Sequence, residues 1–352
     1  MDVNPERDEP EVEPEPDDYE AWFNRGVAHQ TGGKCDEAIR CYKKALEINP
    51  DLCEAWCNLG AAYREDSDDD EAIRCYNKAL SLNPLDQVTW NNLAVAYEAK
   101  GDYRGAIRCC QEALEIQADL AVAWYNMGRA RHHRGDWDEA VRCFECAVQL
   151  EPTDPQFWYD LGVVHDDRQD NDKAKACYQK AVELKPGYFA AWGNLGVSHL
   201  LANEHKEAVR CLEKAVEVKD DEDLLWVNLG LAYVLVGDCD RAVAAAQKAL
   251  AARPDSRRAW CLLGVAFHRK RNYDEAVRCL QKALAMDPGD HMSWYALACA
   301  YALKKDVRTA VEALRKAIER QPEHRNAART DEDFGSIRDE PELRALLKEE
   351  IS

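Results

Sequence analysis

Apolar and small residues recur along this chain three and four residues apart, in successive blocks that each contain two such runs. In residues 53–86, the stretch AWCNLGAAY places Trp56, Leu59 and Tyr63 three and four residues apart, which predicts one face of an amphipathic helix. A second run in the same block follows the i, i+3, i+4, i+7 pattern of another such helix: Ala72, Cys75, Tyr76 and Ala79. The block therefore predicts a pair of short helices that pack against each other.

The helix pair is repeated at a fixed period. Nine of the ten tryptophans are 34 residues apart: Trp22, Trp56, Trp90, Trp124, Trp158, Trp192, Trp226, Trp260 and Trp294. A strict period of this length indicates a stacked array, in which each repeat buries its apolar face against its neighbours. We number positions 1 to 34 in each repeat from Tyr19, which gives nine repeats: 19–52, 53–86, 87–120, 121–154, 155–188, 189–222, 223–256, 257–290 and 291–324.

Small residues and helix breakers occupy fixed positions in the repeat. Position 8 is Gly or Ala, and positions 20 and 27 carry Ala, so that the two helices can approach closely. Glycine at position 15 suits the break between the helices: Gly33, Gly101, Gly135 and Gly237. Proline is frequent at position 32, where it ends the second helix. The pattern predicts an all-α fold without strands.

These positions carry a family resemblance. The signature W-x2-L-G-x2-Y, followed by A-x3-F, Ala and Pro, resembles the tetratricopeptide repeat (TPR) family over residues 19–324. The resemblance implies a right-handed α-solenoid superhelix of antiparallel helix pairs, with the first helix of each pair lining the concave side. The array also resembles the repeat region of the protein O-GlcNAc transferases, although this chain has no catalytic glycosyltransferase region.

Two ends lie outside the array. Residues 1–18 hold nine acidic residues, one arginine and four prolines, a composition that predicts a disordered tail. Residues 325–352 break the repeat and predict a capping segment: a short turn with Phe334 and Ile337, followed by a helix with Leu343, Leu346 and Leu347. Such a segment is expected to cover the exposed face of the last repeat.

Charge and hydropathy exclude several classes of function. The chain has 66 acidic and 46 basic residues, a net charge of -20, which disfavours nucleic acid and anionic membrane surfaces as partners. It has no apolar stretch of transmembrane length and no apolar signal core at its start, so we expect no membrane insertion and a cytoplasmic location.

The 15 cysteines do not predict disulfides or a metal site. Seven of them recur at position 23 of the repeat, so they mark one structural position and are expected to be buried free thiols. Cys143 and Cys146 form a lone CxxC inside a predicted helix, without a second pair at zinc spacing. No phosphate loop, GxSxG or HExxH motif is present. We therefore expect no cofactor and no enzymatic activity.

Asparagine recurs at position 6 of the first helix. Because a helix turns by about 100° per residue, positions 2, 6, 9 and 13 lie opposite the packing face formed by positions 4, 7, 8 and 11. An amide can pair with both the N–H and the C=O of an extended peptide, which predicts a peptide-binding row along the concave groove. The alternatives are solubility and contacts between neighbouring first helices. The row consists of Asn24, Asn58, Asn92, Asn126, Asp160, Asn194 and Asn228.

The same face becomes apolar in repeats six to nine. Its candidate binding residues there are Leu201, Leu231, Leu235, Leu262, Val265, Met292 and Leu303. Exposed apolar patches mark interfaces, so this part of the groove is predicted to bind an apolar or amphipathic segment of a partner. Self-association and occupation by the C-terminal end of the chain are the alternatives.

A basic spot stands out in the fourth repeat. Arg129, His132 and His133 in the stretch GRARHHRGD are expected to border the groove and to bind a carboxylate of a peptide or of the acidic tail. A solvated turn is the alternative. Taken together, the sequence predicts a non-catalytic scaffold that binds peptide segments of other proteins. A targeting subunit of a separately encoded enzyme complex, such as a glycosyltransferase, is the alternative function.

Overall fold

The computed structural model describes residue 15 and residues 17–348, and this part of the chain forms helices and no strand. Almost all of the acidic tail that was predicted to be disordered lies outside the described residues. The described residues divide into an N-terminal part that ends at Gln169 and a C-terminal part that begins at Asp170. None of their helices is long and apolar enough to cross a membrane.

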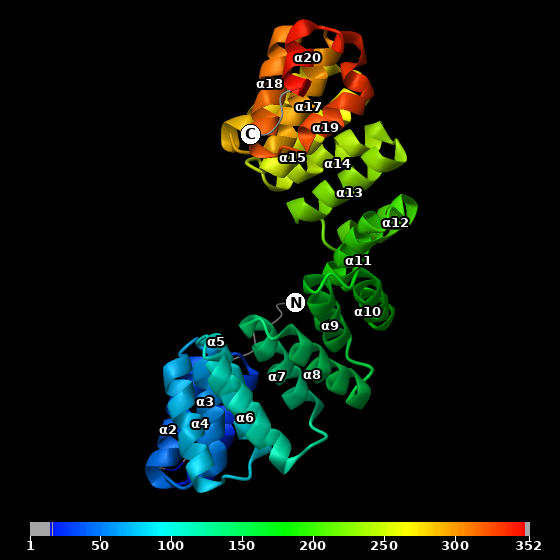
Figure 1. Ribbon diagram of the computed structural model, residues 1–352. Coiled ribbons are helices and arrows are strands. Elements are labelled where there is room, and N and C mark those ends of the chain that lie inside the picture. The colour runs from blue at the N-terminus through cyan, green and yellow to red at the C-terminus, as the bar shows by residue number, and fades with distance from the viewer. Residues whose placement is uncertain (1–14, 16, 349–352) are drawn as a thin grey trace, which may run out of the picture. The chain divides into compact units, whose positions relative to one another are not determined.

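Consecutive helices are stacked in pairs in each part (Figure 1). The N-terminal part contains α1 (Tyr19–Thr31), α2 (Cys35–Ile48), α3 (Cys53–Glu65), α4 (Asp69–Leu82), α5 (Gln87–Ala99), α6 (Tyr103–Ile116), α7 (Ala121–Arg134), α8 (Trp137–Leu150) and α9 (Pro155–Asp167). The C-terminal part contains α10 (Asn171–Leu184), α11 (Phe189–Leu201), α12 (His205–Val218), α13 (Asp223–Val236), α14 (Cys239–Ala252), α15 (Arg257–Arg269), α16 (Tyr273–Met286), α17 (His291–Leu303), α18 (Val307–Arg320), α19 (His324–Thr330), the 3-10 helix η1 (Glu332–Ile337) and α20 (Pro341–Lys348). The fold is the predicted all-α solenoid of helix pairs.

The break between the two helices of a repeat has one geometry throughout. The predicted glycines at position 15 adopt positive φ angles of 72 to 85°, as at Gly33 and Gly237. The five other residues at this position are also left-handed, with φ of 60 to 64°: Ser67, Gln169, Asn203, Arg271 and Lys305. The next residue is the N-cap of the second helix, and in five repeats its side chain caps the helix, as where Asp102 Oδ1 accepts a hydrogen bond of 2.9 Å from the Gly105 N–H.

The tryptophan at position 4 connects neighbouring repeats through its polar edge. The Trp56 indole N–H donates to the Pro50 carbonyl at 2.8 Å, and the Trp294 indole N–H donates to the Pro288 carbonyl at 2.9 Å. Proline at position 32 therefore ends the second helix and also leaves its carbonyl free to accept this bond. From the second repeat onward the tryptophan is only partly buried, whereas Trp22 is buried.

Helix contact inside a repeat depends on the pair of residues at positions 8 and 24. A Cβ atom on Gly26 would lie 2.6 Å from the Tyr42 ring, so only glycine fits against this large residue. In the third repeat Ala94 takes the place of glycine, and the small Cys110 stands where tyrosine stands in the first. Both residues are buried, so a larger residue at position 8 is matched by a smaller residue at position 24.

The cysteines are free thiols, as predicted. Those at position 23 belong to the second helix of seven repeats and are buried. Burial raises the pKa of Cys75 to about 12 and that of Cys143 to about 11. These thiols are therefore neutral at physiological pH and serve as small apolar residues.

The segment after the last repeat packs onto it. Phe334 of η1 and Leu343 of α20 are fully buried, and they share one core with α17 and α18. Ile337, Leu346 and Leu347 belong to the same core. This segment buries the apolar face of α18 that a further repeat would otherwise cover.

Candidate interaction surfaces

The position 6 row makes hydrogen bonds to the preceding first helix. The Asn126 amide N–H donates to Asn91 Oδ1 at 2.8 Å, and the Tyr125 hydroxyl donates to Asp160 Oδ2 at 2.6 Å. The Asn92 amide nitrogen lies 3.9 Å from the sulfur of Cys57. In each case position 6 contacts position 5 of the repeat before it. These three members of the row support the contacts between neighbouring first helices that the sequence offered as an alternative to peptide binding.

The members of the row differ in accessibility. Asn126 is only 6% exposed, so its amide is not accessible to a peptide that lies in the groove. Asn58, Asn194 and Asn228 are half-buried, and Asn24 is exposed. The expected uniform row is therefore divided into members that connect neighbouring first helices and members that are half-buried or exposed.

Leu262 does not belong to the exposed apolar face on which the sequence placed it. It is 6% exposed and packs in a core with Ala246 and Leu263. Its Cδ2 atom comes within 2.4 Å of where a Cβ atom of Gly230 would be. The seventh repeat has small residues at both position 8 and position 24, Gly230 and Ala246, and Leu262 from the next repeat fills the space that they leave.

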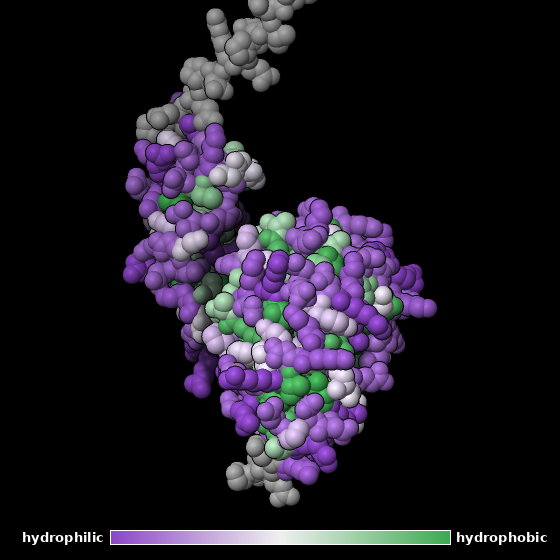
Figure 2. All heavy atoms as spheres, turned by 90° about the horizontal axis from the view of Figure 1, so that it is seen from above, coloured by the Kyte–Doolittle hydropathy of each residue, from purple (hydrophilic) through white to green (hydrophobic). Residues whose placement is uncertain are grey.

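Other apolar residues of this face are exposed as expected. Leu201 of α11 is 63% exposed, and Leu224, Leu231 and Leu235 of α13 are 44%, 42% and 46% exposed. We call these four residues the α11–α13 surface. Met292 of α17 is 55% exposed, whereas Val265 and Leu303 are half-buried. Figure 2 shows apolar patches bordered by polar atoms on one face of the molecule.

The basic spot of the fourth repeat is paired within the chain. Arg129 Nη2 lies 2.9 Å from Glu98 Oε1, and His133 Nε2 lies 3.5 Å from the same oxygen. His132 Nε2 lies 2.6 Å from Asp167 Oδ2. The predicted free basic spot is therefore an ion-pair network, and its carboxylate partners come from the neighbouring first helices. Docking of the acidic tail would involve residues outside the described part of the chain.

Glu98 is the buried centre of this network, and the sequence analysis did not identify it. Its side chain is 7% exposed, whereas that of Arg129 is 38% exposed. Burial raises the pKa of the Glu98 carboxyl, although Arg129 and His133 oppose the shift. Glu98 occupies position 12, outside the positions assigned to the groove face. The only sequence feature that could have indicated its role is the group of basic residues in the next repeat.

The C-terminal segment covers part of the first-helix face of the last two repeats. Tyr295 Oη donates to Asp331 Oδ2 at 2.8 Å, and His268 Nε2 lies 2.8 Å from Asp333 Oδ2. Both aspartates flank or belong to η1. Cys299, a position 9 residue expected to face the groove, is buried under them. At the ninth repeat the chain's own C-terminal segment thus covers the part of the face around Cys299 and leaves Met292 exposed, which agrees in part with one of the alternatives.

The same residues form a possible set of metal ligands. Ligand atoms of Cys299, Asp331 and Asp333 lie within 4.8 Å of one another. Burial, reinforced by the two carboxylates, raises the pKa of the Cys299 thiol, and the carboxylates already bond to Tyr295 and His268. Because both carboxylates already bond to side chains of α17 and α15, this arrangement serves the docking of η1 onto these helices.

Sequence comparisons identify the repeat. A tetratricopeptide repeat model matches residues 159–223, 227–291 and 269–325, and a TPR repeat model matches residues 31–67. The model of the cilia and flagella-associated protein 70 C-terminal domain matches residues 52–187. No curated protein matched the chain. These matches do not single out the O-GlcNAc transferases.

Solved structures share the fold. The C-terminal part of a TPR repeat-containing protein from Cytophaga hutchinsonii is 20% identical, with a TM-score of 0.56, over 68% of this chain and 99% of that chain. A chain of the APC/C hetero-tetramer Cut9–Hcn1 is 17% identical, with a TM-score of 0.52, over 94% of this chain and 75% of that chain. This similarity shows the fold, and the repeat models show that the chain belongs to the tetratricopeptide repeat family.

Proposed function

We propose that this chain is a non-catalytic scaffold for protein–protein interaction, and that its α11–α13 surface binds an apolar or amphipathic segment of a partner. The exposure of Leu201, Leu231 and Leu235 on adjacent first helices is the observation that carries the proposal. Water contact with four leucines is unfavourable, and burying one leucine side chain contributes roughly 1.5 to 3 kcal/mol.

A polar residue beside this surface is proposed to orient the bound segment. Asn194 of α11 and Asn228 of α13 stand at position 6 of the same two helices and are half-buried. The Asn228 amide can accept from and donate to the backbone of a bound segment, while the leucines contact its side chains; Asn194 already has a polar interaction within the chain. In the N-terminal part, Asn24 is the exposed member of the row and has the same role in this proposal, whereas the Asn58 side chain already hydrogen-bonds to Tyr42. The α11–α13 surface is therefore the best-supported centre of binding.

The test compares affinity capture by the full chain with capture by a Leu231→Asp, Leu235→Asp double variant. Proteins captured by the wild-type chain are identified by mass spectrometry, and the Kd of the bound segment is then measured by fluorescence anisotropy. We expect the double variant to weaken binding more than tenfold, because two buried contacts become two buried charges. Circular dichroism checks that the helices are intact.

Leu150→Asp is the matched control. Leu150 is 43% exposed at the end of α8, a second helix, so its substitution is expected to leave Kd unchanged. Equal binding by the double variant and the wild-type chain would contradict the proposal. If capture returns only further copies of this chain, and the double variant is monomeric by light scattering while the wild type is not, the surface is a self-association site.

A further inference from the structure

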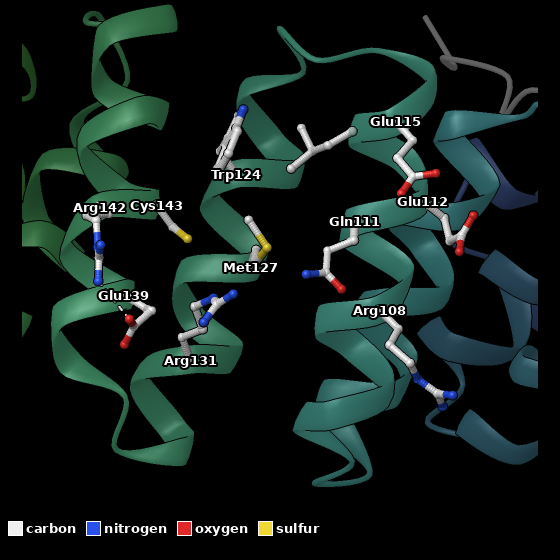
Figure 3. Close-up of a pocket in the computed structure, with 11 residues that line it drawn as sticks. Arg108, Gln111, Glu112, Glu115, Trp124, Met127, Arg131, Glu139, Arg142 and Cys143 are labelled. Carbon is white, nitrogen blue, oxygen red and sulfur yellow. Dashed lines mark hydrogen bonds and ion pairs between the residues drawn. The ribbon is translucent and has the colours of Figure 1, made fainter.

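A hollow on the N-terminal part lies between the second helices of two adjacent repeats. It has a volume of about 600 Å³. Figure 3 shows its lining: α6 contributes residues such as Glu112 and Glu115, α7 contributes Trp124, Met127 and Arg131, and α8 contributes Arg142 and Cys143. Its residues belong to positions outside the first-helix face discussed above, so it is a separate surface.

Equivalent hollows in the C-terminal part are partly filled by a lysine at position 26 of the second helix. Lys316 lines the hollow above Trp294, where its ammonium lies 4.4 Å from the centre of the ring. Lys282 lies 4.1 Å from the Trp260 ring in the same way, and in the N-terminal part Lys44 lies 5.1 Å from the Trp22 ring. The tryptophan at position 4 thus presents a face that holds a cation.

The fourth repeat lacks this lysine. Position 26 is lysine in seven repeats, but it is Glu112 in the third and Cys146 in the fourth. No lysine or arginine among residues 17–348 lies over the Trp124 ring in the way that Lys316 lies over Trp294. The hollow at Trp124 is correspondingly larger than the one of about 320 Å³ at Trp294.

The charges around this hollow differ between its two ends. Glu115 and Trp124 lie toward one end, and Arg108 and Arg131 lie toward the other (Figure 3). Glu112 and Glu115 are exposed, and within the described part of the chain neither belongs to an ion pair. Glu139, by contrast, is paired with Arg142 at 2.7 Å. A cation is therefore favoured at the Trp124 end and repelled at the arginine end.

We propose that the Trp124 end of this hollow binds a basic side chain, lysine or arginine, of a partner protein. The incoming cation takes the place that the lysine at position 26 occupies in the first, eighth and ninth repeats, over the indole ring, and it lies beside Glu115. The net charge of -20 favours the approach of a basic partner segment. The proposal concerns a surface other than the α11–α13 surface and does not depend on it.

The test follows each tryptophan separately in the full chain. The protein is labelled with 5-fluorotryptophan, and the Trp124 signal is assigned in the ¹⁹F spectrum by its loss in Trp124→Phe. The probe is the peptide acetyl-Gly-Lys-Gly-amide, and the control peptide carries norleucine in place of lysine. One exposed cation–π contact and one exposed charge give only weak binding, so we expect a saturable shift of the Trp124 signal with a Kd of about 0.1 M, and both peptides are titrated to that range. The Trp260 and Trp294 signals should not shift.

Two substitutions test the mechanism. Cys146→Lys restores the lysine that seven repeats carry at this position, so the helix tolerates it, and it should abolish the shift. Cys146→Ala is the matched control and should keep it. Glu115→Gln should weaken binding about two- to fivefold through the loss of an exposed charge. The proposal is overturned if the norleucine peptide produces the same shift, if Cys146→Lys retains it, or if Trp124 responds no more than Trp260 and Trp294.

Discussion

The role of a residue in this array is decided by its neighbours in the adjacent repeat as much as by its own position. Position 6 shows this most clearly. Asn126 donates to Asn91 and connects two first helices, whereas Leu262 at the same position leaves the surface and fills a core. The physical signal for Leu262 was present in the sequence, since Gly230 and Ala246 together leave unfilled volume. Position alone predicted exposure, but the neighbouring volumes determined burial.

Glu98 gives a prediction at the same scale. Burial raises the pKa of its carboxyl above the ordinary value of 4.5, so the folded protein favours the protonated form. The stability that this group contributes is fully present below pH 4.5 and is lost as the pH rises through the higher folded-state pKa. We therefore expect Glu98→Gln to increase the free energy of unfolding at pH 7 by about 1 kcal/mol, because it removes a buried charge. Urea unfolding at several pH values measures the difference.

The advantage of Glu98→Gln over the wild type should shrink as the pH approaches 4.5. Arg129→Gln provides the opposite control: it leaves the carboxylate buried without its strongest partner and should lower stability by about 1 to 2 kcal/mol at pH 7. A Glu98→Gln variant less stable than the wild type at pH 7 would show instead that the ion pair with Arg129 outweighs the cost of burial.

At the scale of the element, periodicity was sufficient to predict the helices. The spacing of small and aromatic residues placed two helices in each repeat, and the proline at position 32 placed the end of the second: α2 ends at Ile48 and Pro50 follows. The left-handed residue between the helices was predicted only where glycine occurs, yet Arg271 and Lys305 adopt the same conformation. The C-terminal segment has no repeat to compare with, so the bonds of Asp331 and Asp333 to α17 and α15 could not be predicted.

Position 15 allows a direct measurement of the cost of this conformation. The left-handed conformation costs a residue with a side chain roughly 1 to 2 kcal/mol of folding free energy, and glycine avoids this cost. Glycine is also more flexible in the unfolded chain, which offsets part of the stability gained by the substitution. We expect Lys305→Gly to raise the free energy of unfolding by about 0.5 to 1 kcal/mol. Thermal and urea unfolding, analysed together, would detect this change.

The matching substitution runs in the reverse direction. No atom lies within 4 Å of a Cβ atom added to Gly237, so Gly237→Ala meets no steric obstacle and reports only the backbone cost. It should lower stability by about 1 kcal/mol. If both substitutions leave the unfolding free energy unchanged, the left-handed conformation at this turn carries no measurable penalty.

For the whole molecule, a stacked array predicts that stability is local. Each repeat contacts chiefly its neighbours, so a defect at one end should propagate only a short distance. Phe334 is fully buried where η1 meets α17, and its replacement by alanine should cost about 3 to 5 kcal/mol in the last repeats. Native-state hydrogen exchange measures where this cost falls.

We expect Phe334→Ala to reduce the protection of amides in α17 and α18 and to leave α3 to α6 unchanged. The residues of α17 and α18 lose the apolar cover that η1 and α20 provide, whereas α3 to α6 belong to the N-terminal part and share no core residue with Phe334. A uniform loss of protection in both parts would contradict local stability, because it would require all repeats to unfold as one cooperative unit. In that case the C-terminal segment would control binding at the α11–α13 surface as well as the stability of the last repeat.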